Sequence, residues 1–73
     1  MIEIFGKTQC PYCDKAKALC ESKGYEYTYK QLDKDFTKRE LFQEFPTART
    51  FPQIKMDSQY VGGYTELEAH LNK

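Results

Sequence analysis

The sequence predicts a single α/β domain in which a four-stranded mixed sheet is flanked by three helices, in the order β-α-β-α-β-β-α. Three observations carry this prediction. The chain has 73 residues, which is enough for only one small domain spanning residues 1–73. Short runs of strand-forming residues alternate with stretches that carry apolar residues at helical spacing. Glycines, prolines and capping patterns separate these segments, so each one is short and sharply bounded.

The first third of the chain predicts a strand, a helix and a second strand. Residues 2–5 are apolar and β-branched, and Gly6 ends the run. A helix is expected from Pro11 to about residue 23, because a proline fits the first helical turn and Gly24 stands where a helix ends. Residues 25–30 alternate with a period of two, which is typical of a strand. Such a unit forms a right-handed parallel crossover.

The rest of the chain predicts a short helix, a hairpin and a final helix. Residues 37–40 have capping-box spacing and open a helix that a proline ends, after which residues 46–50 form a connector. Residues 53–56 and 59–61 flank an Asp-Ser pair, which predicts a hairpin with a tight turn. A second capping box at residues 65–68 is expected to open the last helix after two glycines.

Composition excludes several classes of function. Eleven Lys and Arg balance eleven Asp and Glu, so no basic excess is available for nucleic acid. The mean hydropathy is -0.79 and there is no long apolar run, which argues against a membrane partner. Six tyrosines and five phenylalanines can supply a core, so the chain is expected to fold.

The cysteines point to chemistry in a reducing compartment. Three cysteines are too few, and odd in number, for a small secreted scaffold held by several disulfides. No signal-peptide stretch follows Met1, so a cytoplasmic location is expected. In that setting the Cys10-Pro11-Tyr12-Cys13 motif favours redox or metal chemistry over a permanent disulfide.

Cys10 and Cys13 are the predicted catalytic residues. Cys10 lies at the boundary between the first strand and the first helix, where free N–H groups and the positive end of the helix dipole favour a thiolate. Cys10 is therefore the candidate nucleophile. Cys13 follows one helical turn later, within reach of a disulfide with Cys10, which suits a resolving thiol.

Three motifs together resemble a dithiol glutaredoxin of the thioredoxin-like superfamily. They are Cys-Pro-Tyr-Cys after the first strand, Thr50-Phe51-Pro52 before the third, and Val-Gly-Gly-Tyr-Thr-Glu at residues 61–66 after the fourth. The resemblance covers about residues 2–72. It implies a thioredoxin-like fold and a glutathione-dependent thiol-disulfide oxidoreductase, with glutathione as the reductant and no metal cofactor. Pro52 resembles the cis-proline of that superfamily.

The resemblance also implies a glutathione-binding site. Its residues are Lys7, Tyr12, Thr50, Phe51, Pro52, Gly63, Tyr64, Thr65 and Glu66. Lys7 is implied at the glycyl carboxylate, and the amides of residues 63–66 at the γ-glutamyl carboxylate, where a helix N-terminus favours an anion. Glu66 replaces the more usual aspartate, which leaves its contact with the ammonium group open. Thr65 could equally serve only as a helix cap.

Cys20 and His70 have simpler interpretations. Cys20 falls two helical turns after Cys13 and is expected to be a small buried apolar residue. His70 is expected to interact with the dipole of the last helix. Together with the motif they would complete a zinc site, but the chain has no second Cys-x-x-C pair, so no metal site is predicted.

The predicted function is reduction of protein disulfides and glutathionyl mixed disulfides by a monomer, with ribonucleotide reductase as a candidate partner. That partner is implied because the chain is shorter than many glutaredoxins and some members serve as its electron donor. Two alternatives stay open. One is a redoxin of the same fold recharged by thioredoxin reductase, against which the Gly62-Gly63-Tyr64-Thr65 segment argues. The other is a module that binds a metal or an iron-sulfur cluster, which is more typical of single-cysteine motifs.

Overall fold

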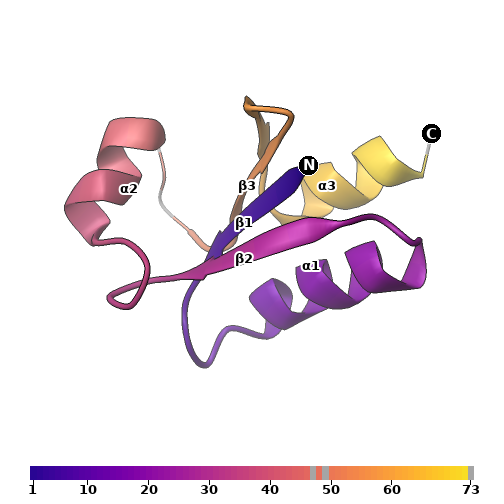
Figure 1. Cartoon of the computed structure of the whole chain (residues 1–73), viewed down its shortest axis with the longest axis horizontal. Helices are drawn as coiled ribbons and strands as arrows, with labels where there is room; N and C mark the ends of the chain where they lie inside the picture. Colours follow the sequence, from indigo (N-terminus) through magenta and orange to yellow (C-terminus); the bar gives the residue numbers. More distant parts are fainter. Residues whose placement is uncertain (47, 49, 73) are drawn as a thin grey trace.

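The computed structural model describes residues 1–46, 48 and 50–72 (Figure 1). Its elements are β1 (Ile2–Gly6), α1 (Pro11–Ser22), β2 (Tyr27–Gln31), α2 (Lys38–Glu44), β3 (Gln53–Met56), β4 (Gln59–Gly62) and α3 (Tyr64–Leu71). This order confirms the predicted one. Thr47 and Arg49, in the predicted connector, and Lys73, at the end of the predicted domain, lie outside the described residues.

The four strands form one mixed sheet in the order β2-β1-β3-β4, as predicted. β1 runs parallel to β2 and antiparallel to β3, and β3 pairs antiparallel with β4. Ile4 at the centre of β1 lies between Tyr29 of β2 and Ile54 of β3. β2 starts two residues later than the expected position 25, because the backbone N–H of Tyr25 donates to the carbonyl of Cys20 and keeps this residue in the turn after α1.

The helices divide between the two faces of the sheet because successive strand residues point to opposite sides. On one face, Ile2 and Ile4 are buried together with Ala16 and Cys20 of α1 and Leu67 of α3. On the other face, Phe5 packs in a second cluster with residues of α2 and its flanking segments: Phe36, Leu41, Phe45 and Ala48. Figure 1 shows α2 at one end of the molecule, away from α1 and α3. The cysteine motif follows β1, which contributes residues to both clusters, and begins α1, which contributes residues to the first cluster.

Capping explains where α2 and α3 begin. The Thr37 hydroxyl accepts from the Glu40 amide at 3.2 Å, and the Glu40 carboxylate accepts from the Thr37 amide at 3.0 Å, which confirms the first capping box. The prediction that residues 65–68 form a second box was wrong. α3 begins at Tyr64, and its N-cap residue is Gly63, whose amide donates to Glu66 Oε1 at 2.8 Å. The glutamate three residues after Gly63 supplies the acceptor, so the helix starts earlier.

The hairpin between β3 and β4 turns at Asp57 and Ser58, as predicted. Both residues have positive φ, 51° and 68°. Two successive positive φ values are the geometry of a type I′ turn, whose twist matches that of the paired strands. The turn therefore holds β4 at the sheet edge and delivers the chain to Gly62 and Gly63, just before α3.

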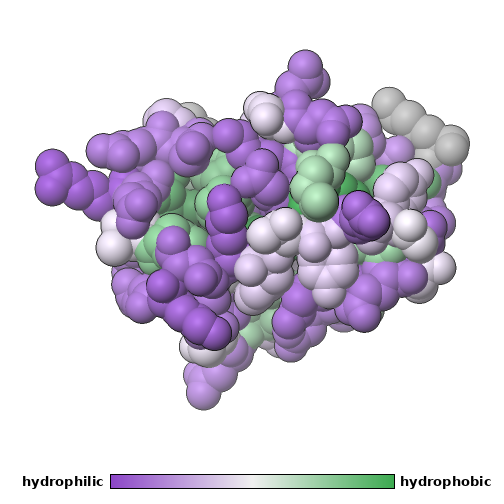
Figure 2. All heavy atoms as spheres, in the orientation of Figure 1, coloured by the Kyte–Doolittle hydropathy of each residue, from purple (hydrophilic) through white to green (hydrophobic). Residues whose placement is uncertain are grey.

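Hydrophilic side chains cover most of the face seen in Figure 2, and hydrophobic ones form small separate areas. In residues 1–46, 48 and 50–72 no helix is long and apolar enough to cross a membrane. Tyr12 and Phe42 are among the large apolar side chains that remain exposed, at 54% and 49%. Both lie beside the site described below.

Replacing Cys20 tests whether the third cysteine has only a structural role. It is fully buried, and burial, with a smaller contribution from Glu21, raises the pKa of its thiol. We expect Cys20→Ala to lower the free energy of unfolding by about 1 kcal/mol and to keep thiol-transfer turnover within about twofold. Denaturant unfolding and steady-state assays measure the two quantities. A large loss of turnover with unchanged stability would place Cys20 in the chemistry instead.

Candidate redox-active site

The two cysteines of the motif are joined and differ in access to solvent. Cys10 and Cys13 form a disulfide, with their Cα atoms 5.2 Å apart. Cys10 is the N-cap residue of α1 and keeps 8% of its surface exposed, whereas Cys13 is one turn inside the helix and fully buried. An incoming substrate can therefore reach only the Cys10 sulfur directly.

The start of α1 directs backbone dipoles at the Cys10 sulfur. The Cys13 amide donates to Cys10 Sγ at 3.2 Å, so the sulfur occupies the place that an oxygen takes in an ordinary N-cap. Pro11, at the first helical position, has no N–H to offer. After reduction of the disulfide, this helix end favours negative charge on Cys10. The cap thus places the two sulfur atoms in unequal surroundings.

A groove of about 310 Å³ brings three separate segments together. It is lined by Tyr12 of α1, by residues before β3 and by the start of α3: Thr50, Phe51, Pro52, Gly63, Tyr64, Thr65 and Glu66. The Phe51–Pro52 peptide bond is cis, as the resemblance implied. Lys7 does not line this groove. Its Nζ lies 5.7 Å from the centre of the Phe51 ring and lines a neighbouring hollow.

Aromatic side chains form one wall of this groove. The rings of Tyr12 and Tyr64 are 5.7 Å apart, and Lys15 Nζ lies 4.9 Å from the Tyr12 ring. The Tyr64 hydroxyl donates to Glu68 at 3.1 Å, and this bond raises the pKa of Tyr64. Lys15 and Glu68 were not predicted. The spacing of Tyr64 and Glu68, four residues apart on one helix, was the signal available for Glu68.

Two glycines precede α3, and the second of them lies close to Pro52. Gly62 has φ +128°, and a Cβ there would lie 2.7 Å from Glu66 Cγ, so this position requires glycine. A Cβ on Gly63 would lie 3.4 Å from the Pro52 carbonyl oxygen. The first N–H groups of any helix lack acceptors within it. The N–H groups of Tyr64 and Thr65 belong to this first turn of α3, and both residues line the groove.

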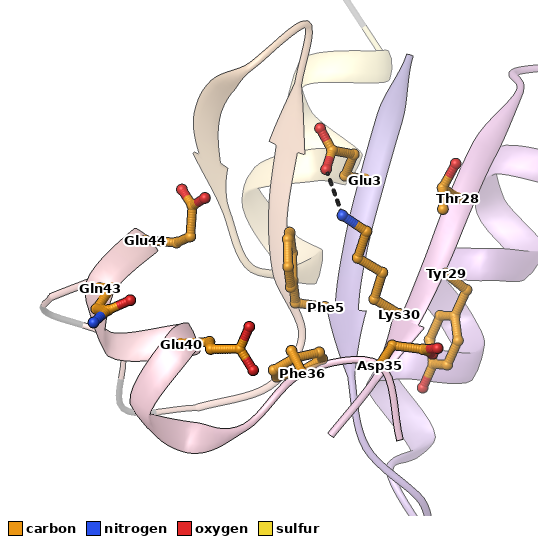
Figure 3. A pocket seen from close by; sticks show the side chains of 10 residues that line it. All are labelled: Glu3, Phe5, Thr28, Tyr29, Lys30, Asp35, Phe36, Glu40, Gln43 and Glu44. Atoms are coloured by element: carbon orange, nitrogen blue, oxygen red, sulfur yellow. Dashed lines mark hydrogen bonds and ion pairs between the residues drawn. The ribbon is translucent and has the colours of Figure 1, made fainter. Parts of the chain in front are cut away.

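A second hollow, of about 710 Å³, lies between α2 and the sheet (Figure 3). Its carboxylates already have partners. Glu3 binds Lys30 at 3.2 Å, and Glu40 belongs to the α2 capping box. Glu44 binds Lys55 at 2.7 Å, which lowers the pKa of Glu44. In the described part of the chain no group of three or more His, Cys, Asp or Glu residues could hold a metal ion.

Comparisons with known proteins agree with this geometry. Residues 2–61 match the glutaredoxin family. Glutaredoxin 3 of Escherichia coli (strain K12) is 41% identical over 68 residues, which cover 93% of this chain and 82% of that protein.

Two solved structures share the fold. The structure of reduced Escherichia coli glutaredoxin superposes with a TM-score of 0.82 at 36% identity, covering 97% of this chain and 92% of that one. The buckwheat glutaredoxin-glutathione complex superposes with a TM-score of 0.80 at 28% identity, covering 97% of this chain and 68% of that one.

The unequal cysteines predict an order of alkylation. In the reduced protein at pH 7, we expect iodoacetamide to modify Cys10 at least about tenfold faster than Cys20, because Cys10 keeps 8% of its surface accessible at a helix start that favours a thiolate, whereas Cys20 is fully buried. Mass spectrometry of peptides over time measures the rates. The Cys10→Ser variant is the control and should lose the fast phase. Equal rates for Cys10 and Cys20 in folded protein would contradict this account of the site.

Proposed function

This chain belongs to the glutaredoxin family and is a thiol-disulfide oxidoreductase, and on that premise we propose that Cys10 is its nucleophile and glutathione its reductant. The observation that carries the proposal is the position of Cys10. It is the more accessible residue of the pair and caps α1, whose first turn presents Tyr12 to the groove. Glutathione is also the ligand bound in the similar buckwheat glutaredoxin complex.

The proposed reaction on a protein disulfide has two halves. The Cys10 thiolate attacks one sulfur of the substrate disulfide, forms a mixed disulfide and releases the other substrate sulfur as a thiolate. Cys13 then attacks Cys10, which releases the second substrate thiolate and leaves the Cys10–Cys13 disulfide present in the structure. The substrate gains two electrons, and the cysteine pair loses two.

Two glutathione molecules restore the enzyme. The first glutathione thiolate attacks the Cys10 sulfur and frees Cys13, which takes up a proton. The second attacks the glutathione sulfur now bound to Cys10, which releases glutathione disulfide and leaves Cys10 as a thiolate. The two glutathione molecules lose two electrons, and the cysteine pair gains them. A glutathionyl mixed disulfide needs only Cys10, since its attack on the glutathione sulfur releases the protein thiol directly.

The groove supports a specific placement of glutathione. Its cysteinyl part would lie against the backbone of Phe51 beside Pro52, with Tyr12 as the wall. The γ-glutamyl carboxylate would meet the free N–H groups of Tyr64 and Thr65, where the helix end favours an anion. Thr50 lines the same groove, and Gly63 allows the close approach of α3. Lys7 would pair with the glycyl carboxylate beyond Phe51.

Glu66 has two roles in this proposal. One carboxylate oxygen accepts from the Gly63 amide, so the side chain stabilises the start of α3. Its negative charge also lies in the lining of the groove, where it would attract the ammonium group of the γ-glutamyl end. The longer glutamate reaches back to its own cap, which an aspartate at this position would do less readily.

We further propose that the protein works as a monomer in the cytoplasm and that ribonucleotide reductase is one of its protein substrates. The cysteine content supports a reducing compartment, and the open groove that Tyr12 and Pro52 line would leave room for an extended polypeptide. Sedimentation of the purified protein tests the monomer, and electron delivery to ribonucleotide reductase in a purified system tests the partner.

The reductant is tested by comparing two recycling systems. We expect turnover of the mixed disulfide of cysteine and glutathione with glutathione, glutathione reductase and NADPH. With thioredoxin reductase and NADPH alone the rate should be at least about tenfold lower, because no reduced glutathione is then supplied to attack the glutathione sulfur bound to Cys10. The opposite ranking would assign the protein to the redoxins that thioredoxin reductase recharges.

The two cysteines should separate by substrate. Cys10→Ser is expected to abolish all thiol transfer, because it removes the accessible sulfur at the helix start. Cys13→Ser should retain removal of glutathione from mixed disulfides and lose mainly the reduction of protein disulfides. Steady-state assays with both substrate types measure this. Retained activity in Cys10→Ser would reverse the assigned roles.

The charge and the cap of Glu66 can be separated with two variants. Glu66→Gln keeps an oxygen for the Gly63 amide and removes the charge, so we expect the KM for glutathione to rise about three- to tenfold with stability unchanged. Glu66→Lys removes both, and should also lose about 1 kcal/mol of stability.

Steady-state kinetics and denaturant unfolding give the two values for each variant. An unchanged KM in well-folded Glu66→Gln would leave Glu66 as a helix cap only.

A further inference from the structure

A second groove opens beside Phe51 and continues the first one. Its volume is about 660 Å³, and it shares Thr50 and Phe51 with the glutathione groove. Its remaining lining includes Leu32, Lys38, Phe42 and Ala48, and we call it the Phe42 groove. Residues 50–51 thus lie between two hollows, one reaching toward α3 and the other toward α2.

The Phe42 groove is apolar and carries positive charge at its edge. Phe42 is 49% exposed and does not belong to the core cluster, whereas its neighbour Leu41 is buried in that cluster beneath it. Lys7 and Lys38 also line the groove, and no Asp or Glu does so among the described residues. A groove lined by apolar side chains and two lysines suits a ligand that combines an apolar side chain with a carboxylate.

Glutathione does not account for the apolar part of this groove. Its C-terminal residue is glycine, which has no side chain to place against Phe42. A polypeptide that crosses residues 50–51 in extended form advances about 3.3 Å per residue. Because Thr50 and Phe51 line both grooves, such a polypeptide would extend from the glutathione groove into the Phe42 groove within a few residues.

We propose that the Phe42 groove binds the polypeptide next to the reacting cysteine of protein disulfide substrates, and that it selects an apolar residue accompanied by an acidic one. The apolar side chain packs on Phe42, and the carboxylate pairs with Lys38. This inference rests on the proposed function and adds a specificity-determining site to it. Phe42 and Lys38 have no part in the proposed placement of glutathione, so the contacts of protein substrates and of glutathione can be separated by mutation at these two residues.

The test compares two disulfide-linked peptide dimers. One peptide carries leucine and aspartate on both sides of its single cysteine, and the matched peptide carries serine and lysine at those positions. The mixed disulfide of cysteine and glutathione is the small reference substrate. The variants are Phe42→Ser and Lys38→Glu. The control is Tyr25→Ser, which removes another exposed aromatic side chain, 46% exposed, in the turn after α1.

Phe42→Ser is expected to lower kcat/KM for the leucine-aspartate peptide by about fivefold or more and to leave the small substrate within about twofold. Lys38→Glu should weaken the same peptide and improve the serine-lysine peptide, which a general loss of folding cannot do. Tyr25→Ser should change neither. The wild-type protein should prefer the leucine-aspartate peptide.

Other outcomes overturn the proposal. Equal losses on both peptides, or no loss in Phe42→Ser, would show that the groove does not select protein substrates. If the wild-type protein fails on the small mixed disulfide, the glutathione-dependent function itself is wrong. Normal turnover of the small substrate with no preference between the peptides would overturn only the proposed role of the Phe42 groove.

Discussion

The packing of α1 against β1 determines where the reactive sulfur lies. Ala16 and Cys20 are fully buried against Ile2 and Ile4, and their small side chains let the helix lie close to the sheet. Because α1 is held along its length, its first turn stays at the end of β1. The Cys10 cap, the buried Cys13 and the position of Tyr12 all depend on this contact.

The site is assembled from both faces of the sheet. α1 and α3 share one core cluster through Ala16 and Leu67, so the cysteine motif and the start of α3 are held by the same packing. The segment before β3 connects this cluster to the other one, because Phe51 packs against the cluster that contains Leu41. The two grooves that meet at Phe51 are therefore supported by different core clusters.

Local interactions made most of the fold predictable, and the two differences arise where local patterns compete or where a backbone hydrogen bond decides a boundary. The Thr37 box and the Asp57-Ser58 turn use interactions within a few residues, which a sequence displays directly. The start of α3 depended on whether Gly63 or Thr65 was its N-cap residue, because the sequence has a glutamate three residues after each of them. The start of β2 depended on a backbone bond from Tyr25 to Cys20, which no side-chain pattern encodes.

The candidate site, too, was predicted only in part from the sequence. Resemblance supplied the residues of the first groove, and eight of the nine line it, with Lys7 on the other side of Phe51. Lys15 and Glu68 were missed because they do not line the groove themselves and instead contact the Tyr12 ring and the Tyr64 hydroxyl. The Phe42 groove was missed because its lining comes from distant parts of the chain, and one exposed phenylalanine carries no pattern in a sequence.

The position of Cys20 on α1 keeps this third cysteine out of the Cys10–Cys13 disulfide. Cys13 and Cys20 are seven residues apart on one continuous helix, a rise of about 10.5 Å, which exceeds the span of a disulfide. The third sulfur cannot pair with either of the others unless α1 unwinds. A protein that makes and breaks one disulfide in every cycle therefore has a single intramolecular oxidised form, and no isomerase is needed to correct it.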